Sequence, residues 1–102
     1  MQPPDITRVF KGPRNEFEVE IVFAREGNQS PKEGHLYDEI IVVTGGVIRL
    51  ERSDRDEIET HSKYDTIFLP KDTVHQITVE TAPVKLVIIH PERTKEGTSL
   101  NN

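Results

Sequence analysis

Polar and apolar residues alternate along much of the chain, a period-two pattern typical of β-strands with one face in a core and the other in water. Residues 16–23 (EFEVEIVF) show it most clearly. Three glutamates of this segment share one parity, and four apolar residues share the other: Phe17, Val19, Ile21 and Phe23. We therefore expect an antiparallel strand with its phenylalanines in the core and its glutamates on the wet face.

Turn residues separate the other strand candidates. The apolar segments 39–44 and 47–52 flank Gly45-Gly46, and this pattern predicts a tight hairpin because glycine readily adopts positive φ angles. No stretch of ten or more residues has helical periodicity, and Arg25–Gly34 has the composition of a loop. Shorter candidates lie between polar turns, at 57–61, 65–69, 74–79 and 84–89, with a weaker one at 6–10. Roughly eight short strands predict an all-β sandwich or barrel, and periodicity alone does not choose between them.

Length, charge and cysteine content narrow the class of protein. The 102 residues suit a single domain over 1–102, with a barrel core at about 16–91 and a polar tail over 92–102. The net charge is −5 and basic residues are scattered among acidic ones, which argues against nucleic-acid binding. Apolar runs fall far short of the roughly 20 residues that span a bilayer. With no cysteine and no signal-like N-terminus, we expect a cytoplasmic protein.

Two strand candidates are apolar on both faces, Ile40–Val43 and Leu86–Ile89. A small barrel with an exposed apolar face is expected to associate with a second copy. The sequence therefore predicts a homodimer.

Strand parity sorts the four histidines. His75 shares parity with apolar residues of its strand, and His35 shares parity with Tyr37, Glu39 and Ile41, so all of these should face inward. His61 should face solvent. His90 ends the last strand just before a proline, where parity is unreliable, and a structural role is expected for it.

Two histidines and one carboxylate facing the interior are expensive to bury unless they are paired or bind a cation. His35, Glu39 and His75 would suit iron and would also accept manganese, nickel or zinc. His35 and Glu39 would be about 13 Å apart in a straight strand, so one metal reaches both only if the chain bends near residues 36–38. The alternative is a hydrogen-bonded polar cluster in a ligand cavity.

Two segments resemble the motifs of the cupin family. The first family motif has a glycine, His-x-His, three or four residues, a glutamate, six residues and a glycine; here His35, Glu39 and Gly46 keep that spacing. The second ends in Pro-x-Gly-x-x-His, and this chain has Pro70-Lys71-Asp72-Thr73-Val74-His75. The two motifs cover about 45 residues in the right order. The resemblance implies a double-stranded β-helix barrel of about eight antiparallel strands, with His35, Glu39 and His75 as three of four metal ligands.

The chain departs from the family pattern at four positions. Glu33 stands where the family has its first histidine, and it could ligate a metal as a carboxylate or simply point to solvent. Tyr64 and Asp72 replace two family glycines, although aspartate tolerates left-handed turn geometry better than most residues. Val79 replaces an asparagine.

Two functional hypotheses follow. One is a metal-dependent enzyme acting on a small organic molecule, an oxygenase, isomerase, epimerase or lyase, with Glu33 or Tyr37 as acid or base. For Tyr37, a half-buried tyrosine at the barrel mouth is the alternative. The other hypothesis is a metal-free barrel that binds or senses a small ligand without catalysis.

Overall fold

A computed structural model of the protein describes residues 2–12 and 17–92. Its regular elements there are all strands: β1 (Asp5–Lys11), β2 (Glu18–Ala24), β3 (Glu39–Arg52), β4 (Glu59–His61), β5 (Thr66–Leu69) and β6 (His75–His90). Among these residues no helix is long and apolar enough to cross a membrane. The all-β prediction is confirmed, and the weaker candidate at 6–10 is the strand β1. Of the predicted polar tail, only Glu92 lies among the described residues.

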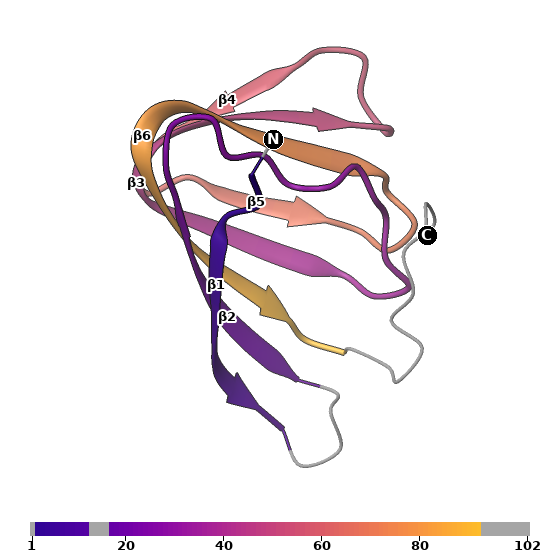
Figure 1. Ribbon diagram of the computed structural model, residues 1–102. Coiled ribbons are helices and arrows are strands. Elements are labelled where there is room, and N and C mark those ends of the chain that lie inside the picture. The colour runs from indigo at the N-terminus through magenta and orange to yellow at the C-terminus, as the bar shows by residue number, and fades with distance from the viewer. Residues whose placement is uncertain (1, 13–16, 93–102) are drawn as a thin grey trace.

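The strands form one antiparallel sheet in the order β1-β2-β6-β3-β4, with β5 also paired to β3. The long strands β3 and β6 pair from Ile40↔Ile89 to Arg52↔His75. Both curve strongly, so that the sheet wraps around into a barrel (Figure 1). Each long strand crosses the barrel twice, and six strands therefore account for the roughly eight that were predicted.

The predicted hairpin at Gly45-Gly46 is wrong, because β3 continues through both glycines. The register against β6 shifts on either side of Gly45, which marks bulges in a bent strand. Gly46 has φ +76°, and a Cβ there would lie 2.4 Å from the Pro83 carbonyl oxygen. Glycine is needed here for a bulge and a close backbone approach. The predicted strands at 74–79 and 84–89 are likewise two halves of β6.

The predicted orientation of the segment 16–23 is also wrong. Glu18 is completely buried, whereas Phe17 is 38% exposed and Ile21 is 46% exposed. Glu16 lies outside the described residues. β2 pairs with β6 so that Glu18 lies opposite His90, and these two polar side chains partner each other in the interior. An alternating strand can be inverted in this way when its polar face finds ionic partners inside and its apolar face lies outside.

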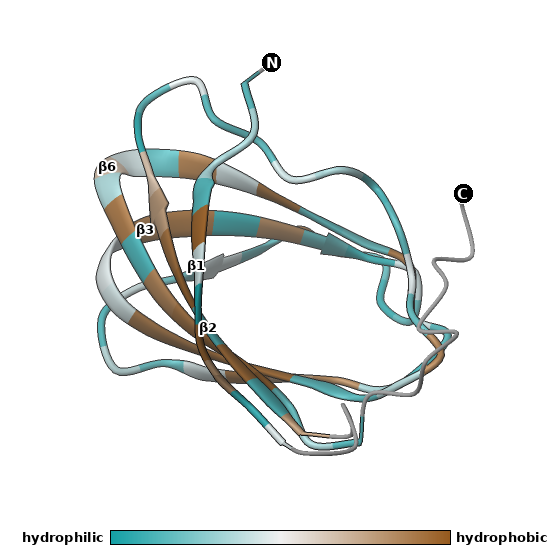
Figure 2. Ribbon diagram, turned by 60° about the horizontal axis from the view of Figure 1, so that its bottom comes forward, coloured by the Kyte–Doolittle hydropathy of each residue, from teal (hydrophilic) through white to brown (hydrophobic). Residues whose placement is uncertain are grey.

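The core is formed by aliphatic residues from four strands. Ile41, Val43, Ile48 and Leu50 of β3 are fully buried, as their parity predicted for the first two. They pack with residues of β2, β5 and β6: Val22, Ala24, Ile67, Leu69, Val84, Leu86 and Ile88. Hydrophobic residues make up much of these strands, as the brown stretches of the ribbon show (Figure 2), and some of them are exposed, among them Ile21 of β2 and Phe68 of β5.

Candidate metal centre

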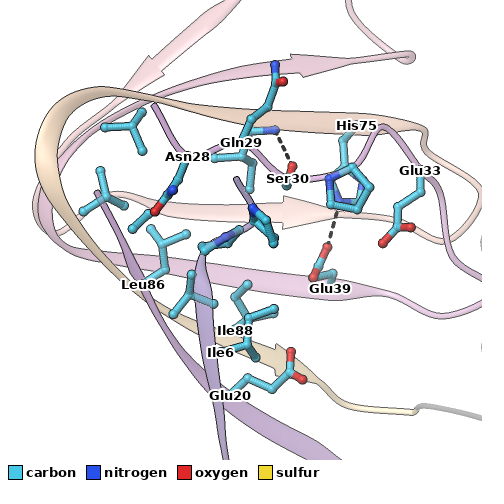
Figure 3. A pocket seen from close by; sticks show the side chains of 18 of the residues that line it. Ile6, Glu20, Asn28, Gln29, Ser30, Glu33, Glu39, His75, Leu86 and Ile88 are labelled. Atoms are coloured by element: carbon cyan, nitrogen blue, oxygen red, sulfur yellow. Dashed lines mark hydrogen bonds and ion pairs between the residues drawn. The ribbon is translucent and has the colours of Figure 1, made fainter. Parts of the chain in front are cut away.

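A cavity of about 380 Å³ opens inside the barrel, between β2, β6 and the segment 28–37. One part of its wall is aliphatic, with Val22, Leu86 and Ile88 among its residues. The other part carries imidazole and carboxylate groups, including Glu39 and His75 (Figure 3). The volume falls within the range of about 300–1,000 Å³ typical of small-molecule sites.

His35, Glu39 and His75, the three predicted metal ligands, come together at the polar end. One ligand atom from each lies within 4.8 Å of the other two. The chain bends at residues 36–37, just before β3 begins at Glu39, and this bend removes the separation that a straight strand would impose. Glu39 Oε1 lies 3.1 Å from His75 Nε2. Two ligands about 2.1 Å from one metal and at right angles would be about 3 Å apart, so this pair fits a shared divalent cation.

The orientation of His75 suits metal binding. Thr73 accepts a hydrogen bond from His75 Nδ1 through its backbone oxygen, at 3.1 Å. With the Nδ1 proton held by Thr73, a deprotonated Nε2 would be available to a metal beside Glu39, whereas in the metal-free site Nε2 carries a proton and donates it to that carboxylate. Two backbone hydrogen bonds join His75 to Glu33, which ties the start of β6 to the loop that carries His35.

Glu33 and Tyr37 both line the cavity. The Glu33 carboxylate lies 3.7 Å from His35 Nε2 and its side chain is 28% exposed. Burial raises the pKa of Glu33, with His75 opposing and Glu39 adding to that effect. Tyr37 is buried rather than half-buried; its ring stacks on His35 at 4.8 Å and meets His90 edge-on at 4.7 Å.

The sequence analysis missed the part of this site formed by His90 and Glu18. His90 is 4% exposed; its Nε2 lies 3.0 Å from Glu39 Oε2, and its Nδ1 lies 3.0 Å from Glu18 Oε1. Arg8 Nε forms an ion pair with Glu18 Oε2 at 2.6 Å. His90 shares parity with the buried residues Leu86 and Ile88, so the pattern of β6 could have placed it inside despite the following proline.

Hydrogen bonds between these groups shift their protonation. Burial alone would raise the pKa of Glu39, but hydrogen bonds from His75 and His90 outweigh it and lower the pKa to about 2. Burial would lower the pKa of His75 and His90, yet the Glu39 carboxylate raises both. In the metal-free site Glu39 is therefore a carboxylate held between two imidazoles.

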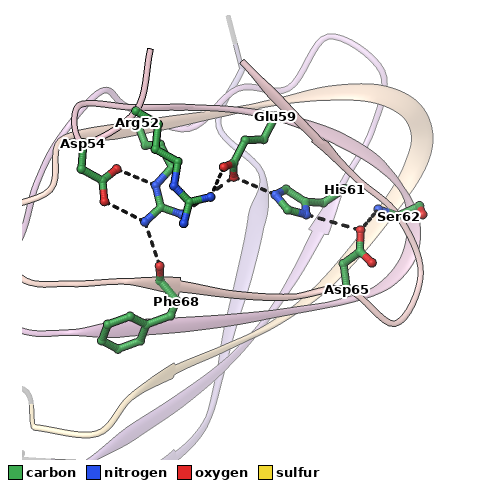
Figure 4. A network of polar contacts seen from close by, with 8 residues as sticks. Arg52, Asp54, Glu59, His61, Ser62, Asp65 and Phe68 are labelled. Carbon is green, nitrogen blue, oxygen red and sulfur yellow. Dashed lines mark hydrogen bonds and ion pairs between the residues drawn. The ribbon is translucent and has the colours of Figure 1, made fainter. Parts of the chain in front are cut away.

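A second polar cluster lies on the side of the barrel formed by β3, β4 and β5 (Figure 4). Arg52 donates to both oxygens of Asp54, at 2.6 and 2.9 Å, and to the Phe68 carbonyl at 3.0 Å. His61 lies between Glu59 and Asp65 and its side chain is only 20% exposed. The predicted solvent-facing orientation of His61 is wrong, because it pairs with the fully buried Ile48 and shares its face. Phe68 joins this cluster only through its backbone carbonyl, which accepts from Arg52, and the residue is 52% exposed.

The two positions where the chain lacks a family glycine keep the glycine-like backbone. Tyr64 has φ +79° and Asp72 has φ +69°. The Asp72 amide donates to the His35 carbonyl at 2.7 Å, so the turn after Pro70 helps to hold the loop that carries a predicted ligand.

Among comparisons with known proteins, only those with solved structures give matches, and these support the fold. No protein-family model matches the chain. No curated protein matches its sequence. An RmlC-like cupin from Methanocaldococcus jannaschii superposes with a TM-score of 0.76 at 11% identity, over 88% of this chain and 81% of that one. KdgF from Halomonas sp. superposes with a TM-score of 0.74 at 20% identity, over 91% of this chain and 84% of its own.

The DMSP lyase DddQ from Ruegeria pomeroyi gives a TM-score of 0.80 at 13% identity, over 96% of this chain and 51% of its own. At these identities the likeness concerns the fold. The two sequence motifs and the structural neighbours agree that this protein has the cupin fold, a double-stranded β-helix.

Proposed function

We propose that the protein binds one divalent metal ion through His35, Glu39 and His75 and acts on a small organic molecule held in the adjoining cavity. The observation that carries this proposal is the convergence of one ligand atom from each residue within 4.8 Å, in the wall of a cavity of about 380 Å³. Iron, manganese, nickel and zinc all suit two imidazoles and a carboxylate.

A metal bound here would act as a Lewis acid toward an oxygen of the substrate. Glu33 and Tyr37 are the groups placed to exchange a proton with the substrate, because both line the cavity beside His35. The raised pKa of Glu33 suits a general acid or base better than that of an exposed carboxylate would. A lyase is among the reactions compatible with this arrangement, as are an oxygenase and an isomerase or epimerase; DddQ is a lyase with the same fold.

The alternative function is ligand binding or sensing without metal. It is favoured by the mutual pairing of the polar groups, since His75 and His90 already neutralise Glu39. The two functions differ in a measurable way: a catalytic metal keeps coordination positions open to water, and a metal-free binding site has none.

The test is a calorimetric titration of chelator-treated protein with Mn²⁺, Fe²⁺, Ni²⁺ and Zn²⁺. The proposal expects one site per chain in the wild type, its loss in His75→Ala, and its retention in the matched control His61→Ala, whose imidazole belongs to the other cluster. Enhanced water-proton relaxation by the Mn²⁺ complex would support open positions. Failure of every metal to bind would favour the metal-free function.

We also propose that two copies associate through the outer face of the sheet. The register places Phe10, Val19, Ile89, Ile40 and Phe68 in one row across five strands, and all of them point away from the core. Phe10 and Phe68 are each 52% exposed. A patch of this kind on a small soluble domain favours a self-complementary two-fold contact. Sedimentation analysis is expected to give a dimer for the wild type and a folded monomer for Ile21→Glu, which adds a charge to this face; a wild-type monomer would refute the association.

The single-domain organisation over residues 1–102 and the cytoplasmic location stay predictions from the sequence.

A further inference from the structure

The end of the cavity away from the metal ligands is largely aliphatic. Its wall contains Val22 and Ala24 of β2, which pair with Leu86 and Val84 of β6. Figure 3 shows Asn28 and Leu86 on the side where β6 bends, whereas the labelled metal ligands lie on the opposite side. Asn28 is therefore a polar residue in an apolar part of the wall.

Two segments run side by side along the cavity, from the metal ligands to Asn28. Glu33 forms an antiparallel bridge with His75 at the metal end, and the register of a second bridge farther along places Asn28 beside Val79. His75 and Val79 both line the cavity and are four residues apart, about 13 Å along the strand at roughly 3.3 Å per residue. A molecule bound at the metal must therefore be elongated to reach Asn28.

The carboxamide of Asn28 has a fixed orientation. Its Oδ1 accepts a hydrogen bond from the Arg25 backbone amide at 2.7 Å, and a backbone N–H can only donate, so the oxygen and nitrogen of this carboxamide cannot be exchanged. In the part of the chain that the structure describes, no residue accepts a hydrogen bond from Nδ2. Asn28 is 8% exposed and lines the cavity, so its NH2 group is available to a bound molecule.

A buried donor of this kind discriminates between the groups that a ligand places against it. An apolar group would displace water from the NH2 of Asn28 and leave the donor unsatisfied, which costs binding free energy. A carbonyl or ether oxygen would accept a hydrogen bond in place of that water. The Ser30 hydroxyl, nearer the metal end, already accepts from the Ile77 amide at 2.8 Å.

We propose that the cavity selects elongated molecules with a metal-binding oxygen group at one end, an apolar middle and a neutral hydrogen-bond acceptor at the other end, and that Asn28 determines this selectivity by donating through Nδ2. This inference rests on the proposed function, since the metal receives the oxygen group. It names a ligand class by shape and hydrogen bonding, and it gives Asn28 a role in specificity that is separate from metal binding.

The test uses two hydroxamates that meet a metal in the same way and have the same shape. They are 7-oxooctanohydroxamate, whose far carbonyl accepts a hydrogen bond, and 7-methylideneoctanohydroxamate, whose C=CH2 group does not. Each is titrated at pH 8, by calorimetry, into protein loaded with whichever of iron, manganese, nickel and zinc it binds most tightly. Because the methylidene probe leaves a buried donor unsatisfied, the ketone is expected to bind about tenfold more tightly to the wild type.

The variant Asn28→Asp separates the two functions of the carboxamide. It keeps an acceptor for the Arg25 amide but replaces the NH2 donor with a carboxylate oxygen, so the preference for the ketone should disappear or reverse. A second variant, Asn28→Ala, removes the donor without adding a charge and should bring the two dissociation constants close to each other. The matched control Gln2→Glu makes the same amide-to-carboxylate change at an exposed residue outside the cavity lining, and it should keep the wild-type preference.

The outcomes separate this inference from the proposed function. Equal affinities of the metal-loaded wild type for the two probes, or no binding of either, would overturn the selectivity while the metal site stands. A preference that persists in Asn28→Asp and Asn28→Ala would overturn the role of Asn28 and assign the donor to another residue, such as the neighbouring Gln29. If the protein takes up none of the four metals, the proposed function fails and this inference fails with it.

Discussion

Replacing His90 should destabilise the protein more than replacing Glu18, and the two effects should not add. His90 bridges Glu18 and Glu39, whose side chains are 0% and 7% exposed. His90→Leu removes the shared donor from two buried carboxylates, and breaking such a buried pair costs about 3–5 kcal/mol. A domain of this size has a free energy of unfolding of only about 5–15 kcal/mol, so the loss is large.

The partner variant leaves fewer groups unsatisfied. In Glu18→Leu, His90 keeps its bond to Glu39, and Arg8, whose side chain is 48% exposed, can be hydrated. We expect Glu18→Leu to lower the free energy of unfolding by about 1–3 kcal/mol. In the double variant Glu18 is no longer left as a buried charge, so the cost should fall short of the sum by about 1–3 kcal/mol.

Urea unfolding of the chelator-treated proteins, followed by circular dichroism, gives the free energies of unfolding of the wild type, the two single variants and the double variant. Additive effects, or a cost below about 1 kcal/mol for His90→Leu, would refute the idea that His90 neutralises two buried carboxylates. The same variant should weaken metal binding by about 10–100-fold, because His90 orients the ligand Glu39 through its bond to Oε2.

Three further predictions concern the backbone and pH. Gly46→Ala should lower the midpoint of thermal unfolding sharply, because its Cβ would lie 2.4 Å from a backbone oxygen at φ +76°; an unchanged midpoint would contradict that geometry. Tyr64→Gly should raise stability by about 0.5–1 kcal/mol, since φ +79° strains a tyrosine more than glycine loses in chain entropy, and urea unfolding would show the opposite sign if that strain were absent. In the metal-free protein the lowered pKa of Glu39 means that its carboxylate contributes stability fully above pH 4.5, and this contribution is lost as the pH falls toward 2. The raised pKa values of His75 and His90 mean that their contribution is complete below pH 6.5 and is lost as the pH rises above that value. Urea midpoints against pH should therefore be highest between pH 4.5 and 6.5, and a maximum near pH 9 would contradict this assignment.

The central strands and the three metal-ligand candidates could be predicted from the sequence because local patterns determine them. Ile41 and His75 lie on long strands whose inward parity is repeated by several aliphatic neighbours. The spacing of His35 and Glu39 requires a bend if one metal is to reach both, and the chain does bend at residues 36–37. Two motifs in the right order indicate the barrel.

What could not be predicted depends on pairing between distant segments. The alternation of β2 is equally compatible with either face in the interior, and the choice is made by His90 and Arg8, which pair with Glu18 from other strands. The pattern of Gly45-Gly46 gives positive φ in a hairpin or in a bulge, and only the long register of β3 against β6 distinguishes the two.

The proposed function requires a metal bound at His35, Glu39 and His75. Metal content, measured by mass spectrometry on protein purified without chelator or affinity-column metal, tests it most directly in the wild type, His75→Ala and His61→Ala. We expect near-stoichiometric metal in the wild type and in His61→Ala, and none in His75→Ala. A wild-type protein that contains no metal, and takes up none when iron, manganese, nickel or zinc is added, would contradict the claim.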